Sequence, residues 1–94
     1  MRVDLALKYL CLVKSRSSVK HLCDGDFVLV NDQPVKPAAA LRTGDRITIR
    51  FPHRTLTIAL VAVPERQMSK SAAPACYEKI ADEIDTEDED ATED

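Results

Sequence analysis

The chain has 94 residues, a formal net charge of −3 and 45% hydrophobic residues, with only four aromatic side chains and no Trp. A chain of this length buries roughly 60% of its unfolded surface, which allows one domain and excludes a large enclosed active site. The small number of aromatic rings argues against a recognition surface built on base stacking, so charge and hydrogen bonds must dominate.

The net charge averages two unlike segments. Residues 1–81 contain all 13 Lys and Arg residues and 7 acids, whereas residues 82–94 contain 9 acids and no base. The basic body predicts a polyanionic partner, and the dense acidic tail predicts disorder. The tail is expected to be a mobile solubilising extension or, alternatively, an RNA-mimicking competitor that folds back on the basic face.

The predicted elements begin with two short helices. Apolar residues recur at three- and four-residue spacing over residues 3–13, with Asp4 in the first turn, where it is expected to cap the helix or pair with a neighbouring base. Ser15 is the expected N-cap of a second helix that runs to about Cys23. Gly25 is expected to end this helix in a left-handed conformation.

A β-hairpin is predicted over residues 27–36, with its turn at Asn31 and Asp32. Because Asp replaces the Gly that is usual at the second turn position, a longer loop through Gln33 and Pro34 is an alternative. Either form places a short β-rich segment directly after the second helix.

Alternating apolar and polar residues over 46–51 and 55–62 predict two further strands. Residues 65–73 lack periodicity, which indicates a linker, and three large apolar residues on one side predict a short helix over 75–84. The expected order is ααββββ. The predicted class is α+β, with two short N-terminal helices packed on a small, curved, mainly antiparallel sheet.

Short motifs recur in a fixed order: RxD at 2–4, KSRS at 14–17, GDFVLVN at 25–31, VKP at 35–37 and GD at 44–45. Together they resemble the S-four RNA-binding domain over roughly residues 1–63. The short free-standing members are the most similar, namely the small ribosome-associated heat-shock protein and the RqcP-type ribosome quality control factor. The predicted division is therefore an RNA-binding domain over 1–63, a linker with a possible short helix over 64–81, and an acidic tail over 82–94.

The resemblance implies an RNA-binding, ribosome-associated protein of translation quality control, because such relatives bind large-subunit rRNA and tRNA on subunits with a stalled nascent chain. It implies structured RNA as the partner and neither a cofactor nor a small-molecule substrate. Leu5, Cys11 and Asp32 depart from the family pattern. The RNA-contact positions that match are Arg2, Lys8, Lys14, Ser15, Arg16, Ser17, Lys20, Asn31 and Lys36.

Helix geometry independently favours the second helix as the main anion-binding element. Arg16 and Lys20 are one turn apart next to a capped N-terminus, where backbone amides and the helix dipole attract phosphate. Arg16 can bind a phosphate with two parallel hydrogen bonds, with Lys14 as a point charge beside it. The alternative for these cations is a solvated helix face, and for Ser15, Ser17 and Asn31 it is a structural role in the cap and the turn.

No catalytic constellation is visible, so we expect no enzyme activity. His21 and His53 have no Cys or acidic partner at ligand spacing, which argues against a metal site. Three widely spaced cysteines, of which at least one must be unpaired, predict a reducing compartment, and with no signal peptide and no membrane-length apolar run the expectation is a cytoplasmic protein. A monomer is expected.

The rival functions are a basic adaptor that binds an acidic protein through an exposed Leu5, and an RNA-modifying enzyme, for which no catalytic domain follows.

Overall fold

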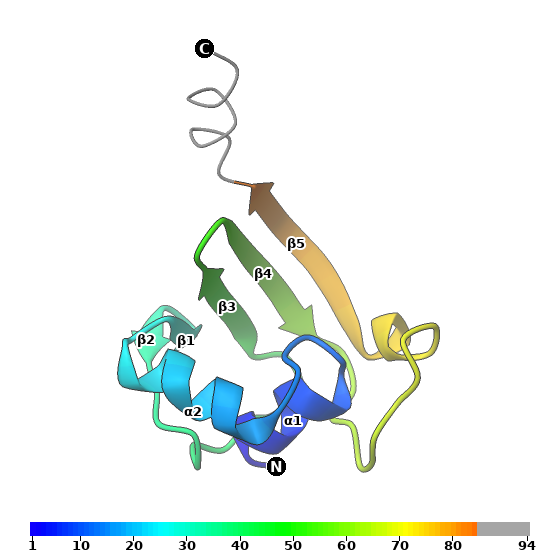
Figure 1. The fold of residues 1–94 in the computed structure, drawn as a ribbon. Coiled ribbons are helices and arrows are strands. Elements are labelled where there is room, and N and C mark those ends of the chain that lie inside the picture. The colour runs from blue at the N-terminus through cyan, green and yellow to red at the C-terminus, as the bar shows by residue number, and fades with distance from the viewer. Residues whose placement is uncertain (85–94) are drawn as a thin grey trace.

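The computed structural model describes residues 1–84, which form two α-helices, a short 3₁₀ helix and a five-stranded sheet (Figure 1). Every strand pairing is antiparallel, and the strand order is β2-β1-β3-β4-β5. The predicted α+β class is confirmed. The elements are α1 (Val3–Tyr9), α2 (Arg16–Asp24), β1 (Val28–Val30), β2 (Gln33–Pro34), β3 (Arg46–Phe51), β4 (Arg54–Leu60), η1 (Ala73–Cys76) and β5 (Tyr77–Ile84).

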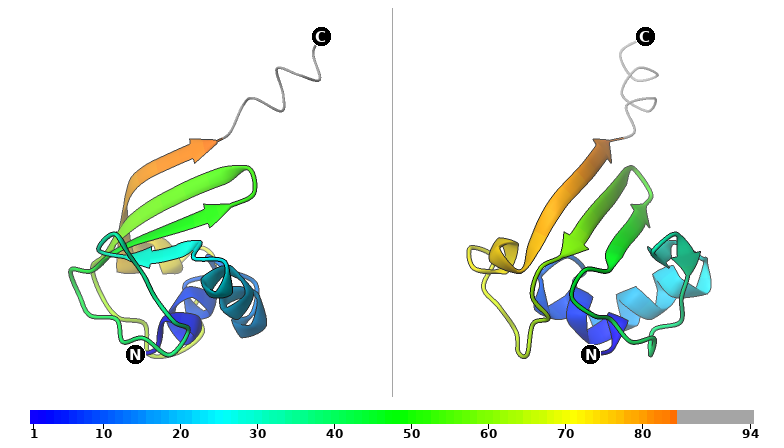
Figure 2. Two further views of the ribbon diagram at one scale, coloured as in Figure 1. Left: turned by 90° about the vertical axis from the view of Figure 1, so that its left-hand side faces the viewer. Right: turned by 180° about the vertical axis from the view of Figure 1, so that it is seen from behind.

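Both helices cover one face of the sheet, and strands β3 to β5 extend beyond them (Figures 1 and 2). The covered face carries alternate residues of β3 and β4, including Ile47, Ile49 and Ile58, all fully buried. Each such side chain contributes roughly 1.5–3 kcal/mol when removed from water. The alternation of apolar and polar residues predicted from the sequence therefore identifies the face of the sheet that forms the core. No helix within residues 1–84 has the length and apolar character needed to cross a membrane.

Helix α1 is shorter than predicted, because it ends at Tyr9 instead of continuing to Val13. Cys11 has a φ of 61°, which breaks the helical path, and the N–H groups of Leu12 and Val13 both donate to the Leu7 carbonyl. The apolar periodicity nevertheless holds, because the turn returns Val13 to the core at 7% exposure.

Helix α2 begins as predicted, with the Ser15 hydroxyl accepting a hydrogen bond from the Ser18 N–H at 3.2 Å. The left-handed conformation expected at Gly25 is wrong: its φ is −92°, and the left-handed residue is Asp26 at 63°. Gly25 lies close to the Phe27 ring instead. A Cβ at this position would lie 2.5 Å from that ring, so a larger residue would require the Phe27 side chain, which is 47% exposed, to move.

The hairpin has the two-residue turn and not the longer loop. Asn31 and Asp32 have φ values of 52° and 70°, and Val30 pairs directly with Gln33. Both turn residues adopt the left-handed conformation of a type I′ turn, which Asn and Asp tolerate better than most residues.

The helix predicted over residues 75–84 is wrong. The chain forms η1 and then the eight-residue strand β5, which pairs with β4 along its whole length. Pairing covers backbone groups of β4 that would otherwise form a sheet edge. Residues 82–84, expected to start the acidic tail, thus belong to the sheet, whereas the rest of that tail lies outside the described residues. The β4–β5 register shifts between Thr57 and Ile58. Strand β5 is curved along its length (Figure 2).

Candidate nucleic-acid interface

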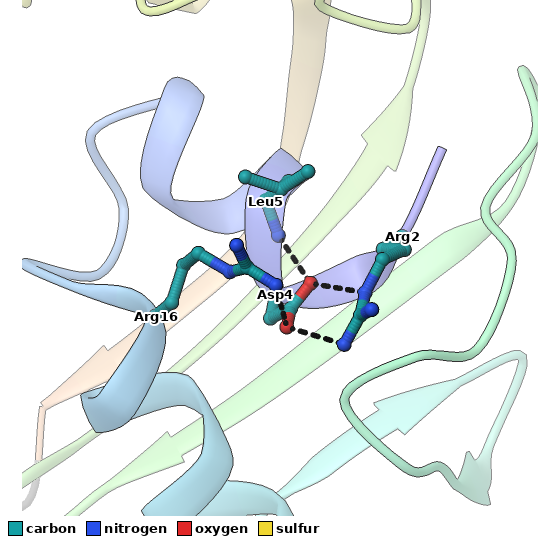
Figure 3. Close-up of polar contacts among 4 residues, drawn as sticks. All are labelled: Arg2, Asp4, Leu5 and Arg16. Atoms are coloured by element: carbon teal, nitrogen blue, oxygen red, sulfur yellow. Dashed lines mark hydrogen bonds and ion pairs between the residues drawn. The ribbon is translucent and has the colours of Figure 1, made fainter.

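A buried carboxylate lies at the centre of the candidate interface. Asp4 in α1 has a side chain only 5% exposed, and two arginines approach it from opposite sides (Figure 3). Arg2 donates from Nε to Oδ1 at 3.1 Å and from Nη2 to Oδ2 at 3.0 Å, and Arg16 donates from Nη2 to Oδ2 at 3.3 Å. The expected pairing of Asp4 with a neighbouring base is confirmed. One carboxylate therefore holds the starts of α1 and α2 together.

The electrostatics of this contact keep Asp4 ionised. Burial raises the pKa of the Asp4 carboxyl and is the largest single influence on it. The hydrogen bonds from Arg2, from the Leu5 N–H at 2.7 Å and from Arg16 together outweigh burial, so the pKa lies below its usual value of 3.8. The two arginine side chains remain 49% and 48% exposed and keep N–H donors that Asp4 does not use. These donors are available to an anion from solvent.

The loop that contains Pro37 and Ala39, which is distant in sequence from α1, completes the site. The Val3 N–H donates to the Ala39 carbonyl at 2.9 Å, and the Asp4 N–H donates to the Pro37 carbonyl at 3.1 Å. These bonds satisfy N–H groups that the first turn of a helix leaves without a partner. They also fix the chain just after Lys36 against the start of α1.

The result is a depression of about 390 Å³ at the N-terminal end of α2. Its only acid is Asp4, and we refer to it as the cationic depression; it is lined by Arg2, Asp4, Arg16, Ser17, Lys20, Lys36, Pro37 and Ala38. Lys20 also pairs with Asp24 at 3.2 Å, but both side chains are more than half exposed, and such a pair contributes little. The depression thus combines four cations with a helix N-terminus.

The other predicted contact residues lie elsewhere. Lys8 and Lys14 line a second hollow together with Cys11 and Val13. Ser15 is occupied as the N-cap of α2. The Asn31 side chain accepts a hydrogen bond from the Arg46 N–H at 2.9 Å and donates to Asp45 at 3.1 Å, which secures the hairpin to β3. Five of the nine predicted positions therefore line the cationic depression, and four do not.

The sequence interpretation missed Gln67 and Lys70, which join Lys8 and Lys14 around the second hollow. Gln67 donates from Nε2 to the Lys8 carbonyl at 3.2 Å, and the Met68 N–H donates to the Tyr9 carbonyl at 3.0 Å. The segment around Gln67 therefore closes the C-terminal end of α1. Its sequence has no periodicity, so no local signal indicated this position.

Metal-binding side chains are not gathered in the described part of the chain. Within residues 1–84, no group of three or more His, Cys, Asp or Glu is placed to hold a metal ion. Cys11, Cys23 and Cys76 are free thiols, and burial, followed by the nearby carboxylates of Asp24 and Asp4, raises the pKa of Cys23. The arrangement that the structure does provide is suited to binding phosphate oxygens through guanidinium and ammonium groups.

Comparison with known proteins gives a consistent result. The S4 domain family matches residues 1–47, half of the chain. The chain is 32% identical over 78 residues to the RQC P-site tRNA stabilizing factor of Halalkalibacterium halodurans, covering 83% of this chain and 88% of that protein. For the protein of the same name from Listeria monocytogenes, identity is 30% over 83 residues, covering 88% and 89%. The trimeric structure of Vibrio cholerae Heat Shock Protein 15 has a TM-score of 0.80 at 27% identity, covering 86% of this chain and 82% of that one.

The chain therefore belongs to the S4 domain family, and the resemblance inferred from its short motifs is confirmed. Every residue that lines the cationic depression lies within the matched region. Both of these relatives are matched along more than four-fifths of their own length, and both are named RQC P-site tRNA stabilizing factors.

Proposed function

We propose that this protein binds structured RNA on the large ribosomal subunit and stabilises P-site tRNA in translation quality control. The family, the relatives' shared name and the cationic depression all support this function. The protein acts by binding and not by turnover. A protein that acts on the ribosome functions in the cytoplasm, and this location is part of the proposal.

The single observation that carries the proposal is the convergence of Arg2, Arg16, Lys20 and Lys36 on one depression. These residues come from three separate parts of the chain. Charges that interact only with solvent are expected to be spread over the surface instead. The shared contact with Asp4 holds the two guanidinium groups before RNA arrives, so less freedom is lost on binding.

Phosphate neutralisation gives the binding mode a measurable signature. Each phosphate contact releases counterions from the RNA, so the affinity falls as salt rises. Four contacts predict a loss of roughly 50- to 150-fold between about 50 and 200 mM salt. The helix N-terminus adds backbone donors but no change in this slope.

The rival adaptor function loses its main sequence feature. Leu5, expected to be exposed, is half-buried, and its N–H group donates to Asp4. The monomeric state remains a prediction. The similar Vibrio cholerae structure is described as trimeric, so sedimentation of the free protein decides between these states.

The test uses purified tRNA and the double variant Arg16→Ala/Lys20→Ala. We expect tRNA affinity to fall and the slope of log affinity against log salt to decrease by about two. The matched control is Arg54→Ala/Lys79→Ala, which removes the same charge from the opposite end of the sheet. Fluorescence anisotropy across a salt series measures both.

Equal losses in the two double variants would show that only net charge matters and would contradict the proposed site. Pull-down of an acidic protein partner that survives nuclease treatment would instead favour the adaptor function. Thermal melting of each variant checks that the fold is intact.

A further inference from the structure

An apolar groove lies beside the cationic depression, on the other side of α2. It has a volume of about 510 Å³, within the range of roughly 300–1,000 Å³ typical of pockets for small ligands. Its walls come from three elements: Leu12 and Val13 from the α1–α2 loop, Leu22 from α2 and Phe51 from the end of β3. Leu12, Leu22 and Phe51 pack against the core yet remain partly exposed.

The groove and the depression share one residue. Ser17, in the first turn of α2, lines both of them. Helix periodicity explains this arrangement: Arg16 and Lys20, four residues apart, face the depression, whereas Ser17 and His21, also four apart, face the groove. A chain that crosses the start of α2 therefore meets cations on one side and an apolar recess on the other.

The groove has the chemistry that a nucleobase requires. Its lining combines apolar residues, Phe51 among them, with the exposed polar residues Lys14, Ser17 and His21, and it includes no acid. Unpaired RNA bases bind proteins by stacking their faces on aromatic or apolar side chains and by hydrogen bonding at their edges. The scarcity of aromatic residues excludes a platform for several bases, but one recess needs only one ring.

We propose that this groove receives a single unstacked nucleobase of the RNA whose backbone phosphates occupy the cationic depression. The inference rests on the proposed RNA-binding function and adds a ligand subsite to it. Its occupant is an extruded or bulged base, because a base within a continuous duplex would have to give up its stacking and pairing energy to enter the groove, whereas an unpaired base gives up much less. The protein therefore prefers RNA that offers an unpaired nucleotide next to a helical backbone.

The test compares three RNA hairpins with the same stem: one with a single bulged uridine, one with an abasic site at the bulge, and one without a bulge. The wild-type protein is expected to bind the bulged-uridine hairpin about tenfold more tightly than the abasic hairpin, as for one stacked base. Leu22→Asn should abolish this preference while leaving the salt dependence unchanged. Ile80→Asn makes the same replacement at an exposed position of β5 and should keep the preference.

Each outcome separates the groove from the depression. Equal wild-type affinity for all three hairpins, with a steep salt dependence, would overturn the base subsite and leave the proposed RNA-binding function standing. Absence of binding to every hairpin would overturn both. If Leu22→Asn melts at a much lower temperature, His21→Ala, at an exposed rim position, replaces it, and full retention of the preference there would overturn the proposal.

Discussion

Two regions of the molecule use the same ionic motif with opposite results. At the start of α1, Arg2 makes a two-point contact with Asp4 and Arg16 adds a second cation. At the far end of the sheet, Arg54 contacts Asp82 at 2.7 and 2.9 Å, and Lys79 joins at 3.2 Å. Both motifs place two cations on one carboxylate.

Their surroundings make the difference. Asp4 is buried and further cations adjoin it, so the first motif presents unused donors and a net positive charge. The Asp82 side chain is 22% exposed, and Glu83 follows it along the strand, so the second motif is closer to neutral. The comparison teaches that a carboxylate can support an anion site when it is buried beneath the cations that it orients.

The largest expected effect comes from replacing the buried carboxylate. Asp4→Asn removes the charge that orients Arg2 and Arg16, so we expect RNA affinity to fall roughly tenfold, equivalent to about 1.4 kcal/mol, although the site gains positive charge. Asp82→Asn makes the same change at the exposed motif and should leave RNA affinity unaltered. Anisotropy titration with tRNA measures both. Tighter binding by Asp4→Asn would show that Asp4 is only an unfavourable counter-charge.

A second, smaller effect concerns stability against pH. Because the pKa of Asp4 in the folded protein lies below the unfolded value near 3.8, its contribution to the free energy of unfolding is fully present above that value. The contribution is lost as the pH falls through the lowered folded pKa. Urea unfolding from about pH 6 to pH 2 should therefore show a shallower loss for Asp4→Asn than for the wild type.

Salt sharpens this pH comparison between the two motifs. The hydrogen bond from Arg54 is the main cause that lowers the pKa of Asp82, but this side chain is 22% exposed, against 5% for Asp4. Its contribution should disappear in about 1 M NaCl, where the screening length is near 3 Å, whereas that of Asp4 should persist. Asp82→Asn and Asp4→Asn unfolded in parallel at low and high salt provide the measurement. An equal salt response would contradict the importance of burial.

The smallest expected effect concerns residues 85–94, which lie outside the described structure and contain seven acids and no base. Deleting them changes the formal net charge from −3 to +4. If this segment competes with RNA for the basic face, non-specific RNA binding at low salt should tighten, by about two- to fivefold through long-range electrostatics. Unchanged binding would favour the alternative of a solubilising extension. The same segment with its acids replaced by Ser and Gln separates charge from length.

The helical part of the fold was predictable because its signals are local. The spacing of Val3, Leu7 and Leu10 identified the buried side of α1, and all three are fully buried. Ser15 identified the start of α2 through its capping hydroxyl. The hairpin was predictable from Asn31, even though Asp32 adopts a left-handed conformation less readily than Gly does.

Strand β5 was not predictable from local signals. Tyr77, Ile80 and Ile84 have the spacing of a helix face, yet Ile80 and Ile84 are 51% and 61% exposed in the strand. The decisive interaction is the pairing of β5 with the edge of β4, which is distant from it in sequence. A register shift next to Ile58 adds a further irregularity that no periodic pattern contains.

The candidate site divides in the same way. The convergence of Arg16 and Lys20 follows from helix geometry alone. Their meeting with Arg2 and Lys36 depends on backbone contacts between the chain start and the loop near Pro37, which the sequence does not reveal. Lys14, which precedes the N-cap of α2, lies outside this group and lines the second hollow.

The position of β5 has a consequence for biosynthesis. Its residues emerge from the ribosome after all of β4, so a nascent chain can assemble the helices, the hairpin and the β3–β4 pair while one flank of that pair is still bare. An exposed flank of this kind invites pairing with another polypeptide. Release of residues 77–84 covers the edge of β4, and β5, which carries the charged residues Glu78, Lys79 and Glu83, becomes the outer strand on that side.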